Sequence, residues 1–490
     1  TDQFTQRYGI AFGGPITEHV SFRINGSYYG GDGAQENIGF GDDYDEPDQV
    51  FFSPQLRFKT DRMDLNLRYA KVEDDGVPRS QVLLTNFDST TPEFTYAGQT
   101  LPNAFHLWDG QPPSVDADCP PITPAWECGD LENKLFTNRS AEGNRTSESQ
   151  SVEFSFDISD SLTLRYTYGD NETNSFAQKD SDHTNRVRSA DDPTVASDAP
   201  ARLVDNEFQV LYEYEETSHE LQLVSNFDGN FNFIAGLYTY ENDTGWFVPS
   251  FRHAETYVGT SADDAAIAAG FGGCGDVLPF ISLFGIGVTS PEDAIAAGTP
   301  GNYWYCPEGS DFSQWLLFGT TASSETEAAF VNMEYQFNDQ WLISGGLRYT
   351  EDEKIQETNG GFAIFSFLFG VPLGIMFDDS DPNPRSWDAT IGHISVEYNH
   401  RDDLLLYGRL STGYRAGSFN PKSDAIPALV DEETLINYEI GMKGMFMDGR
   451  LRLTSALFYN DFDDYQITGS IQPQGTTGQS ATDGIFSSFS

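Results

Sequence analysis

Few side chains in this sequence could carry out chemistry. It contains no His-Glu-x-x-His zinc motif, no Gly-x-Ser-x-Gly nucleophile turn and no Walker phosphate loop. The seven His residues lack the spacing of metal ligands, and no Cys–His pair stands in a catalytic context. The many carboxylates are better explained by loops and a polar lining than by a general acid/base pair. We therefore expect no catalytic residue and no enzyme activity.

Four cysteines form two local pairs, Cys119 with Cys128 and Cys274 with Cys306. Such thiols either form disulfides or bind a metal ion. No neighbouring His or Cys completes a set of four ligands, so we expect no metal site here and no resident cofactor.

Charge and composition exclude two classes of protein. The chain of 490 residues has 76 acidic and 27 basic side chains, a formal net charge of -49, so it lacks the cationic surface of a nucleic-acid binder. No stretch approaches the roughly 20 uninterrupted apolar residues that a membrane-spanning helix requires. Aromatic residues make up 14% of the chain, with 38 Phe, 23 Tyr and 46 Gly, which is the balance of a large β-structure.

The segments between the turns, which must position any site, are dominated by alternating apolar and polar residues. Val20, Phe22 and Ile24, for example, alternate with Ser21 and Arg23. A period of two places each set on its own side of a sheet. In a membrane barrel the apolar set faces lipid and the polar set faces a wet lumen. The predicted lumen-facing or plug-facing residues are Arg23, Arg68, Arg165, Arg348, Arg409, Glu439 and Lys443.

Short and long connections alternate along the chain. Short turns are predicted at 13–15, 60–61, 159–160, 228–230, 338–339, 400–402 and 447–449, from their Gly, Asn, Asp and Pro content. Long irregular stretches are predicted at 30–48, 73–146, 172–215, 246–323, 355–386 and 418–433. Loops of this length are uncommon in compact soluble domains, whereas membrane barrels have short periplasmic turns and long extracellular loops. We therefore predict an all-β, antiparallel transmembrane β-barrel rather than a soluble β-sandwich array.

About fourteen strands fit around these seven turns. Open sheet edges in lipid leave backbone groups unpaired at several kcal/mol each. Fourteen strands therefore form either a small closed barrel or part of a larger one.

Several stretches resemble TonB-dependent outer-membrane receptors. They include residues 406–420 (LYGRLSTGYRAGSFN) and 433–444, with Tyr-Glu-Ile-Gly-Met-Lys-Gly at 438–444. Residues 219–225, 234–238 and 345–350 continue the resemblance, which is specific as a set and weak for each segment alone. The type is that of siderophore receptors similar to the pesticin receptor.

The resemblance implies a plug domain inside a 22-stranded barrel, a TonB-binding segment, and a location in the outer membrane of a Gram-negative bacterium. One strand before Thr1, fourteen present and seven after Ser490 would complete that count, so we expect residues 1–490 to be a partial barrel domain without the plug or the last strands. The implied function is active uptake of a scarce ligand, most simply a ferric siderophore. The implied partners are the TonB complex acting through the plug, and the lipopolysaccharide of the outer membrane.

In an envelope protein, an even number of cysteines on the outer side predicts two disulfides, 119–128 and 274–306, each stiffening one loop.

Apolar runs stand in loops that should be polar. They contain Phe280, Phe284, Trp315, Phe365, Phe367 and Phe369, which are candidate ligand-binding residues. Such patches mark packing or binding surfaces. The loops either pack on one another as an extracellular cap or line a vestibule for a partly apolar ligand such as an iron chelate.

Two other functions remain open from the sequence. A passive porin-like channel needs no plug, and an adhesin or surface protein needs the barrel only as an anchor. The sequence does not identify the ligand.

Overall fold

The computed structural model describes most of the strands and a smaller part of the loops. The described residues are 4–37, 43–79, 93–96, 99–102, 134–135, 141–180, 206–252, 296, 302–305, 314–362, 376–379, 383–401, 403–420, 429–471 and 485–489. Among them, no helix is long and apolar enough to cross a membrane.

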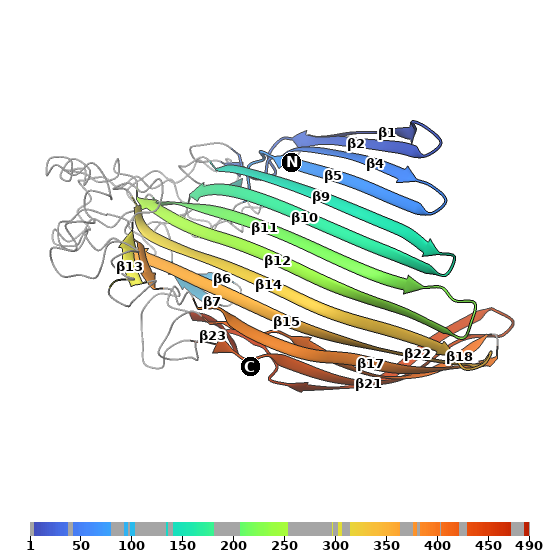
Figure 1. The fold of residues 1–490 in the computed structure, drawn as a ribbon. Helices are drawn as coiled ribbons and strands as arrows, with labels where there is room; N and C mark the ends of the chain where they lie inside the picture. Colours follow the sequence, from blue (N-terminus) through green and yellow to red (C-terminus); the bar gives the residue numbers. More distant parts are fainter. Residues whose placement is uncertain are drawn as a thin grey trace, which may run out of the picture.

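Fourteen long strands form one antiparallel sheet, in which each strand pairs with the next along the chain (Figure 1). In order they are β1 (Thr5–Pro15), β2 (Val20–Gly31), β4 (Asp48–Lys59), β5 (Met63–Asp74), β9 (Glu142–Ser159), β10 (Leu162–Asp180), β11 (Asn206–Ser225), β12 (Phe231–Arg252), β14 (Gln314–Gln336), β15 (Trp341–Phe362), β17 (Arg385–Arg401), β18 (Leu404–Arg415), β21 (Glu433–Phe446) and β22 (Leu451–Asp463). The sheet curves like the wall of a barrel (Figure 1). The predicted strand number and antiparallel arrangement are confirmed.

Short strands lie between the long ones. Strands β13 (Asn302–Tyr305) and β16 (Met376–Asp379) pair with each other and extend the sheet from β15, so two long connections are joined there. The remaining pairs are β3 (Glu36–Asn37) with β8 (Lys134–Leu135), β6 (Glu93–Tyr96) with β7 (Gln99–Pro102), β19 (Ser418–Phe419) with β20 (Leu429–Val430), and β23 (Ile467–Ile471) with β24 (Ile485–Phe489).

All seven short turns lie at one end of the sheet (Figure 1). Six occur where the sequence predicts them. The prediction for the first was wrong by a few residues, because 13–15 still pair with 21–23 and the chain turns at 16–19. There the N–H groups of Ile16 and Thr17 donate to the carbonyl oxygen of Val20, at 2.7 and 3.1 Å.

Several strands are longer than predicted. Strands β10, β11, β12, β14 and β15 continue for many residues beyond the length that crosses a membrane, because neighbouring strands keep pairing above it. The predicted loops 172–215, 246–323 and 355–386 are therefore shorter in the structure. Trp315, predicted to lie in a loop, is in β14.

The two faces of the sheet differ in exposure and chemistry. Directly paired residues share a face, so the pairing assigns every strand position to one side. On one face Ala328, Thr350 and Ser395 are 7–9% exposed, as expected for the concave side of a curved sheet. On the other, Leu237 and Leu347 are 59% and 61% exposed. We call these the polar face and the apolar face.

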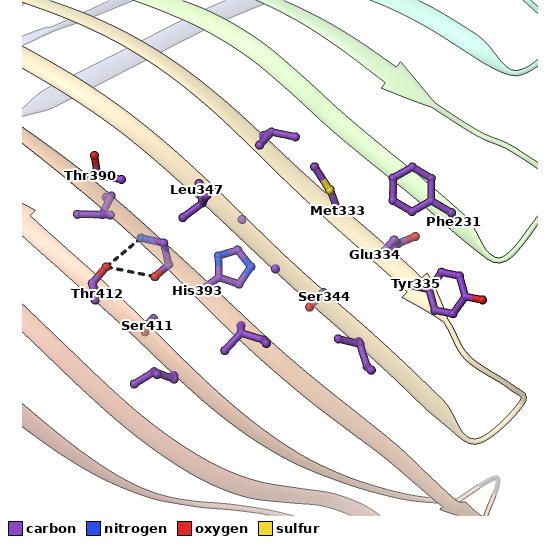
Figure 2. A pocket seen from close by; sticks show the side chains of 18 residues that line it. Phe231, Met333, Glu334, Tyr335, Ser344, Leu347, Thr390, His393, Ser411 and Thr412 are labelled. Carbon is purple, nitrogen blue, oxygen red and sulfur yellow. Dashed lines mark hydrogen bonds between the residues drawn. The ribbon is translucent and has the colours of Figure 1, made fainter.

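Within the described part of the wall, the join between β17 and β18 is incomplete. The pairing of β17 with β18 ends at His393 and Ser411, although β17 stays paired with β15 up to Arg385 and β18 with β21 up to Arg415. At this point the Gly392 N–H donates to Thr412 Oγ1 at 2.9 Å, and the Thr412 hydroxyl donates to the Gly392 carbonyl at 3.3 Å (Figure 2). One side chain thus replaces the next pair of backbone bonds.

Replacing Thr412 with Val should destabilise the sheet by about 1–3 kcal/mol, because the Gly392 N–H and carbonyl lose their partner in an apolar setting. Thr412→Ser keeps the hydroxyl and should retain most of the stability. Denaturant unfolding of the complete protein in detergent micelles measures both. Equal stability of the Val and Ser variants would contradict this role of the hydroxyl.

Candidate functional site: the polar face and its long-loop end

All seven predicted lumen residues lie on the polar face. Arg23 and Arg68 both pair with Gln55, so they share a side. Arg165 and Arg348 stand in a single cross-strand row through Gln222, Gly236 and Phe330. Arg409 pairs with Glu439, and Lys443 pairs with Leu405 in the same two strands. The structure therefore gathers these residues on one surface, while contact with a plug stays a prediction.

Four of the five predicted lumen arginines form no ion pair within the described residues: Arg23, Arg165, Arg348 and Arg409. Arg68, by contrast, lies 3.3 Å from Glu153. Such unpaired guanidinium groups are unexpected in a chain with 76 acidic side chains. They leave the polar face able to bind an anionic partner.

Arg348 is held in a defined place among these four. Its guanidinium carbon lies 5.2 Å from the ring centre of Tyr238 and 5.8 Å from that of Phe330, within cation–π range. Its Nε donates to Thr350 Oγ1 at 3.0 Å. The rings and the hydroxyl fix the stem, and the remaining N–H groups have no partner among the described residues.

A polar cavity of about 640 Å³ lies at the long-loop end of the polar face. Its wall is one cross-strand row across five strands: Tyr29, Gln49, Asp74, Arg145 and Ser175. Its cover comes from residues 32–34, 45–47 and 76–79, which add Asp32, Glu46 and Arg79 to the lining. The cavity therefore presents carboxylates and guanidinium groups together.

The segment that covers this cavity is itself well packed. Tyr44 and Gln35 are 0% and 1% exposed, and each donates its N–H to the other's carbonyl, at 2.9 and 3.0 Å. Asp74 accepts bonds from Gly76 N at 3.2 Å and Gln49 Nε2 at 3.3 Å, which ties the cover to the wall. Nearby, burial lowers the pKa of the Lys179 ammonium, which donates to the Arg79 carbonyl at 2.9 Å.

The segment after β18 crosses the incomplete join on the polar side. Lys354 Nζ donates to the Gly417 carbonyl at 2.8 Å and lies 5.7 Å from the Trp387 ring. Trp387 makes an edge contact with Phe419 at 6.3 Å, and a Cβ at Gly417 would overlap the Trp387 ring. Burial lowers the pKa of Lys354. This packing covers the gap between β17 and β18.

On the apolar face, an apolar belt ends in a band of carboxylates. Glu325 is paired directly with Glu241 on one side and Glu353 on the other. A second row joins Glu327, Glu351 and Asp388. The belt below them covers about ten residues of each strand, which is the length that crosses a bilayer. Like charges directly opposite each other are destabilising, so this band carries an electrostatic cost.

Sequence reasoning missed the polar cavity, because its wall is a row of single residues from five strands. Only the register between strands reveals such a row. The residues Cys119, Cys128, Cys274, Phe280, Phe284, Cys306, Phe365, Phe367 and Phe369 lie outside the described residues, and the side chain of Trp315 is not described either. Among the described residues, no group of three or more His, Cys, Asp or Glu side chains could hold a metal ion.

The model of the family described as "TonB dependent receptor-like, beta-barrel" matches residues 86–488. The chain belongs to this family. Its members are transport receptors of the Gram-negative outer membrane, so the short turns are periplasmic and the long loops extracellular. The family resemblance found in the sequence is confirmed, and so are the barrel fold and its location.

Among curated proteins, the pesticin receptor of Yersinia pestis is 28% identical over 157 residues, which is 31% of this chain and 21% of that receptor. Two solved structures are similar in fold. The ferric yersiniabactin uptake receptor FyuA from Yersinia pestis has a TM-score of 0.56 at 14% identity, covering 95% of this chain and 53% of that one. The ferric-catecholate import receptor Fiu from Escherichia coli K12, in its closed form, has a TM-score of 0.53 at 12% identity, covering 100% and 59%. The chain thus spans little more than half the length of the two solved receptors.

Replacing Glu325 with Gln should stabilise the sheet by about 0.2–1 kcal/mol, because it removes repulsion from two directly paired carboxylates. Glu213→Gln is the matched control, since Glu213 lies on the same face in the outer part of β11 but pairs with Asn174 and Gly245. Unfolding at low ionic strength compares the two, and added Mg²⁺ should reduce the gain. A gain as large for Glu213→Gln would contradict the repulsion argument.

Proposed function

We propose that residues 1–490 are part of the barrel domain of an outer-membrane receptor that takes up a ferric siderophore with energy supplied through TonB. The observation that carries this proposal is the family assignment over residues 86–488, together with the barrel wall itself. The pesticin receptor and the two iron-uptake receptors similar in fold favour an iron chelate as the ligand.

The polar cavity at the extracellular end supports capture of a polar, charged ligand. It has guanidinium groups from Arg79 and Arg145, carboxylates from Asp32 and Asp74, and the phenol of Tyr29. Its volume of about 640 Å³ lies within the usual range of small-molecule sites. Ferric siderophores carry hydroxyl, carbonyl and charged groups that such a lining can hydrogen-bond. The six aromatic residues named from the sequence, of which Trp315 is in β14, would add an apolar part to the same vestibule.

The unpaired arginines of the polar face support a plug domain in the lumen. In the proposed receptor the plug belongs to the same polypeptide outside residues 1–490, blocks the lumen and connects to TonB. Its acidic or carbonyl groups would satisfy Arg23, Arg165, Arg348 and Arg409. Glu439 and Lys443 would contact the plug or the wet interior from the same surface.

The remaining parts of the proposal follow from this role. The receptor transports its ligand and catalyses no reaction. Disulfides 119–128 and 274–306 stiffen two extracellular loops. The outer rim contacts lipopolysaccharide.

The function is tested by uptake of radioactive iron in an iron-starved host that lacks its own receptors and expresses the complete gene. Ferric yersiniabactin and a ferric catecholate are the probes. Accumulation that disappears when TonB is deleted supports the proposal. Accumulation that persists without TonB indicates a passive channel, and binding to cells without any uptake indicates an adhesin.

In the same assay Arg348→Glu should reduce uptake about tenfold, because a charge-assisted hydrogen bond is worth about 1.5–3 kcal/mol and the reversal also adds repulsion. Arg348→Lys should retain most of the activity. Arg450→Glu, in a periplasmic turn, is the matched charge reversal and should leave uptake unchanged. Normal uptake by Arg348→Glu would contradict a role for this residue in seating the plug.

A further inference from the structure

The apolar face has a groove on the side of the sheet opposite the lumen residues. It lies over β12, β14, β15, β17 and β18 and has a volume of about 750 Å³ (Figure 2). Its walls are Met333, Ile343, Leu347, Ile394 and Leu410, all on the apolar face. These side chains are 39–61% exposed, so protein covers none of them fully.

Two glycines form the floor of this groove. Gly345 stands directly opposite Ile394, and Gly392 directly opposite Leu347. A Cβ at Gly392 would lie 2.6 Å from the Gly346 carbonyl oxygen and 2.8 Å from Leu347 Cδ2, so the site requires glycine. Each missing side chain leaves a hollow beside a large apolar one.

At the incomplete join between β17 and β18, the backbone N–H and carbonyl groups on the floor of the groove are hydrogen-bonded. Thr412 bonds to both the N–H and the carbonyl of Gly392, which would otherwise face the groove at the incomplete join (Figure 2). A groove with its polar backbone atoms paired suits an apolar occupant.

A second groove, of about 770 Å³, lies on the other side of a ridge formed by Ile394 and Leu410. Its lining includes Gly408, Ile440 and Leu457, with Gly408 at a floor position where an added Cβ would meet nothing closer than 3.9 Å. The two grooves share the two ridge residues. They therefore run beside each other on the same face.

The position of the two grooves along the membrane normal indicates which molecule fills them. The first groove begins near Phe231 and Tyr335, beside the periplasmic turns, and ends near Thr390 and Thr412. Above it stands the carboxylate row that includes Glu351 and Asp388, which repels anionic headgroups. The grooves thus lie within the hydrocarbon layer and are approached from the periplasmic leaflet.

We propose that the paired grooves bind one phospholipid of the periplasmic leaflet, with one acyl chain on each side of the Ile394–Leu410 ridge. The lipid headgroup lies at the periplasmic rim, beside the aromatic side chains Phe231 and Tyr335. The bound chains cover the thin, glycine-lined part of the wall next to the join between β17 and β18. This site depends on the barrel fold alone and not on the transported ligand.

The test is native mass spectrometry of the complete receptor, released from detergent after incubation with a diacyl phosphatidylethanolamine. The wild type should retain one lipid. Gly408→Leu fills the second groove and should lower the retained population about tenfold, equivalent to about 1.4 kcal/mol. Gly26→Leu is the matched control, because Gly26 is on the apolar face of β2, away from both grooves, and an added Cβ there would meet nothing closer than 3.6 Å; it should leave retention unchanged.

Ile394→Ala provides an independent variant. It removes one of the two ridge side chains without adding bulk, and it should also lower retention. A single-chain lysophosphatidylethanolamine should be retained less than the diacyl lipid. Equal retention by the wild type and both groove variants would overturn the proposal. Equal retention of the single-chain lipid, or retention of lipopolysaccharide in place of phosphatidylethanolamine, would overturn it as well.

Discussion

Backbone hydrogen bonding in a medium without water is the constraint on which this structure depends. An N–H or carbonyl left unpaired in hydrocarbon costs several kcal/mol, so each strand must have a partner on both sides. This requirement explains the unbroken order from β1 to β22. It also explains Thr412, whose hydroxyl takes over where β17 and β18 stop pairing. On the polar face, the packing of Lys354 and Trp387 around Gly417 covers the same gap.

A continuous sheet with lipid on one side and a wet lumen on the other has two surfaces of opposite chemistry. The apolar face presents side chains such as Leu237 and Leu347 to lipid, while Arg348 and its row point to the concave side. Charged side chains are also distributed unevenly over the sheet. Directly paired carboxylates stand at the outer end of the apolar face, and the polar face carries four predicted lumen arginines that form no ion pair among the described residues. The arginines suit a wall whose inner side faces the polypeptide plug of the proposed receptor.

Alternation along the sequence was sufficient to predict the strands, because each one spans two environments and so carries a strict period of two. The stretch at Val20–Asn25 shows this pattern, and β2 contains it. The turn chemistry was sufficient for six of the seven short turns. Strand ends above the membrane were not predictable, since both faces of β14 are polar near Ser323 and Ser324 and the period disappears.

The candidate site was predictable in part. The parity of Arg165 and Arg348 placed both on the polar side, but their common row depends on register across five neighbouring strands. The polar cavity requires the same information for Tyr29, Asp74 and Arg145, together with the fold of the segment around Tyr44. Local sequence carries no signal for such long-range register.

The sidedness of the wall is tested most directly by nitroxide labels placed one at a time along β12, at positions 233–240, in the complete protein reconstituted in lipid. Collision rates with oxygen and with a water-soluble nickel chelate report the two environments. The account predicts that odd positions such as Leu237 are accessible to oxygen and shielded from nickel, and that even positions such as Tyr238 show the reverse. Equal nickel accessibility at odd and even positions would contradict it.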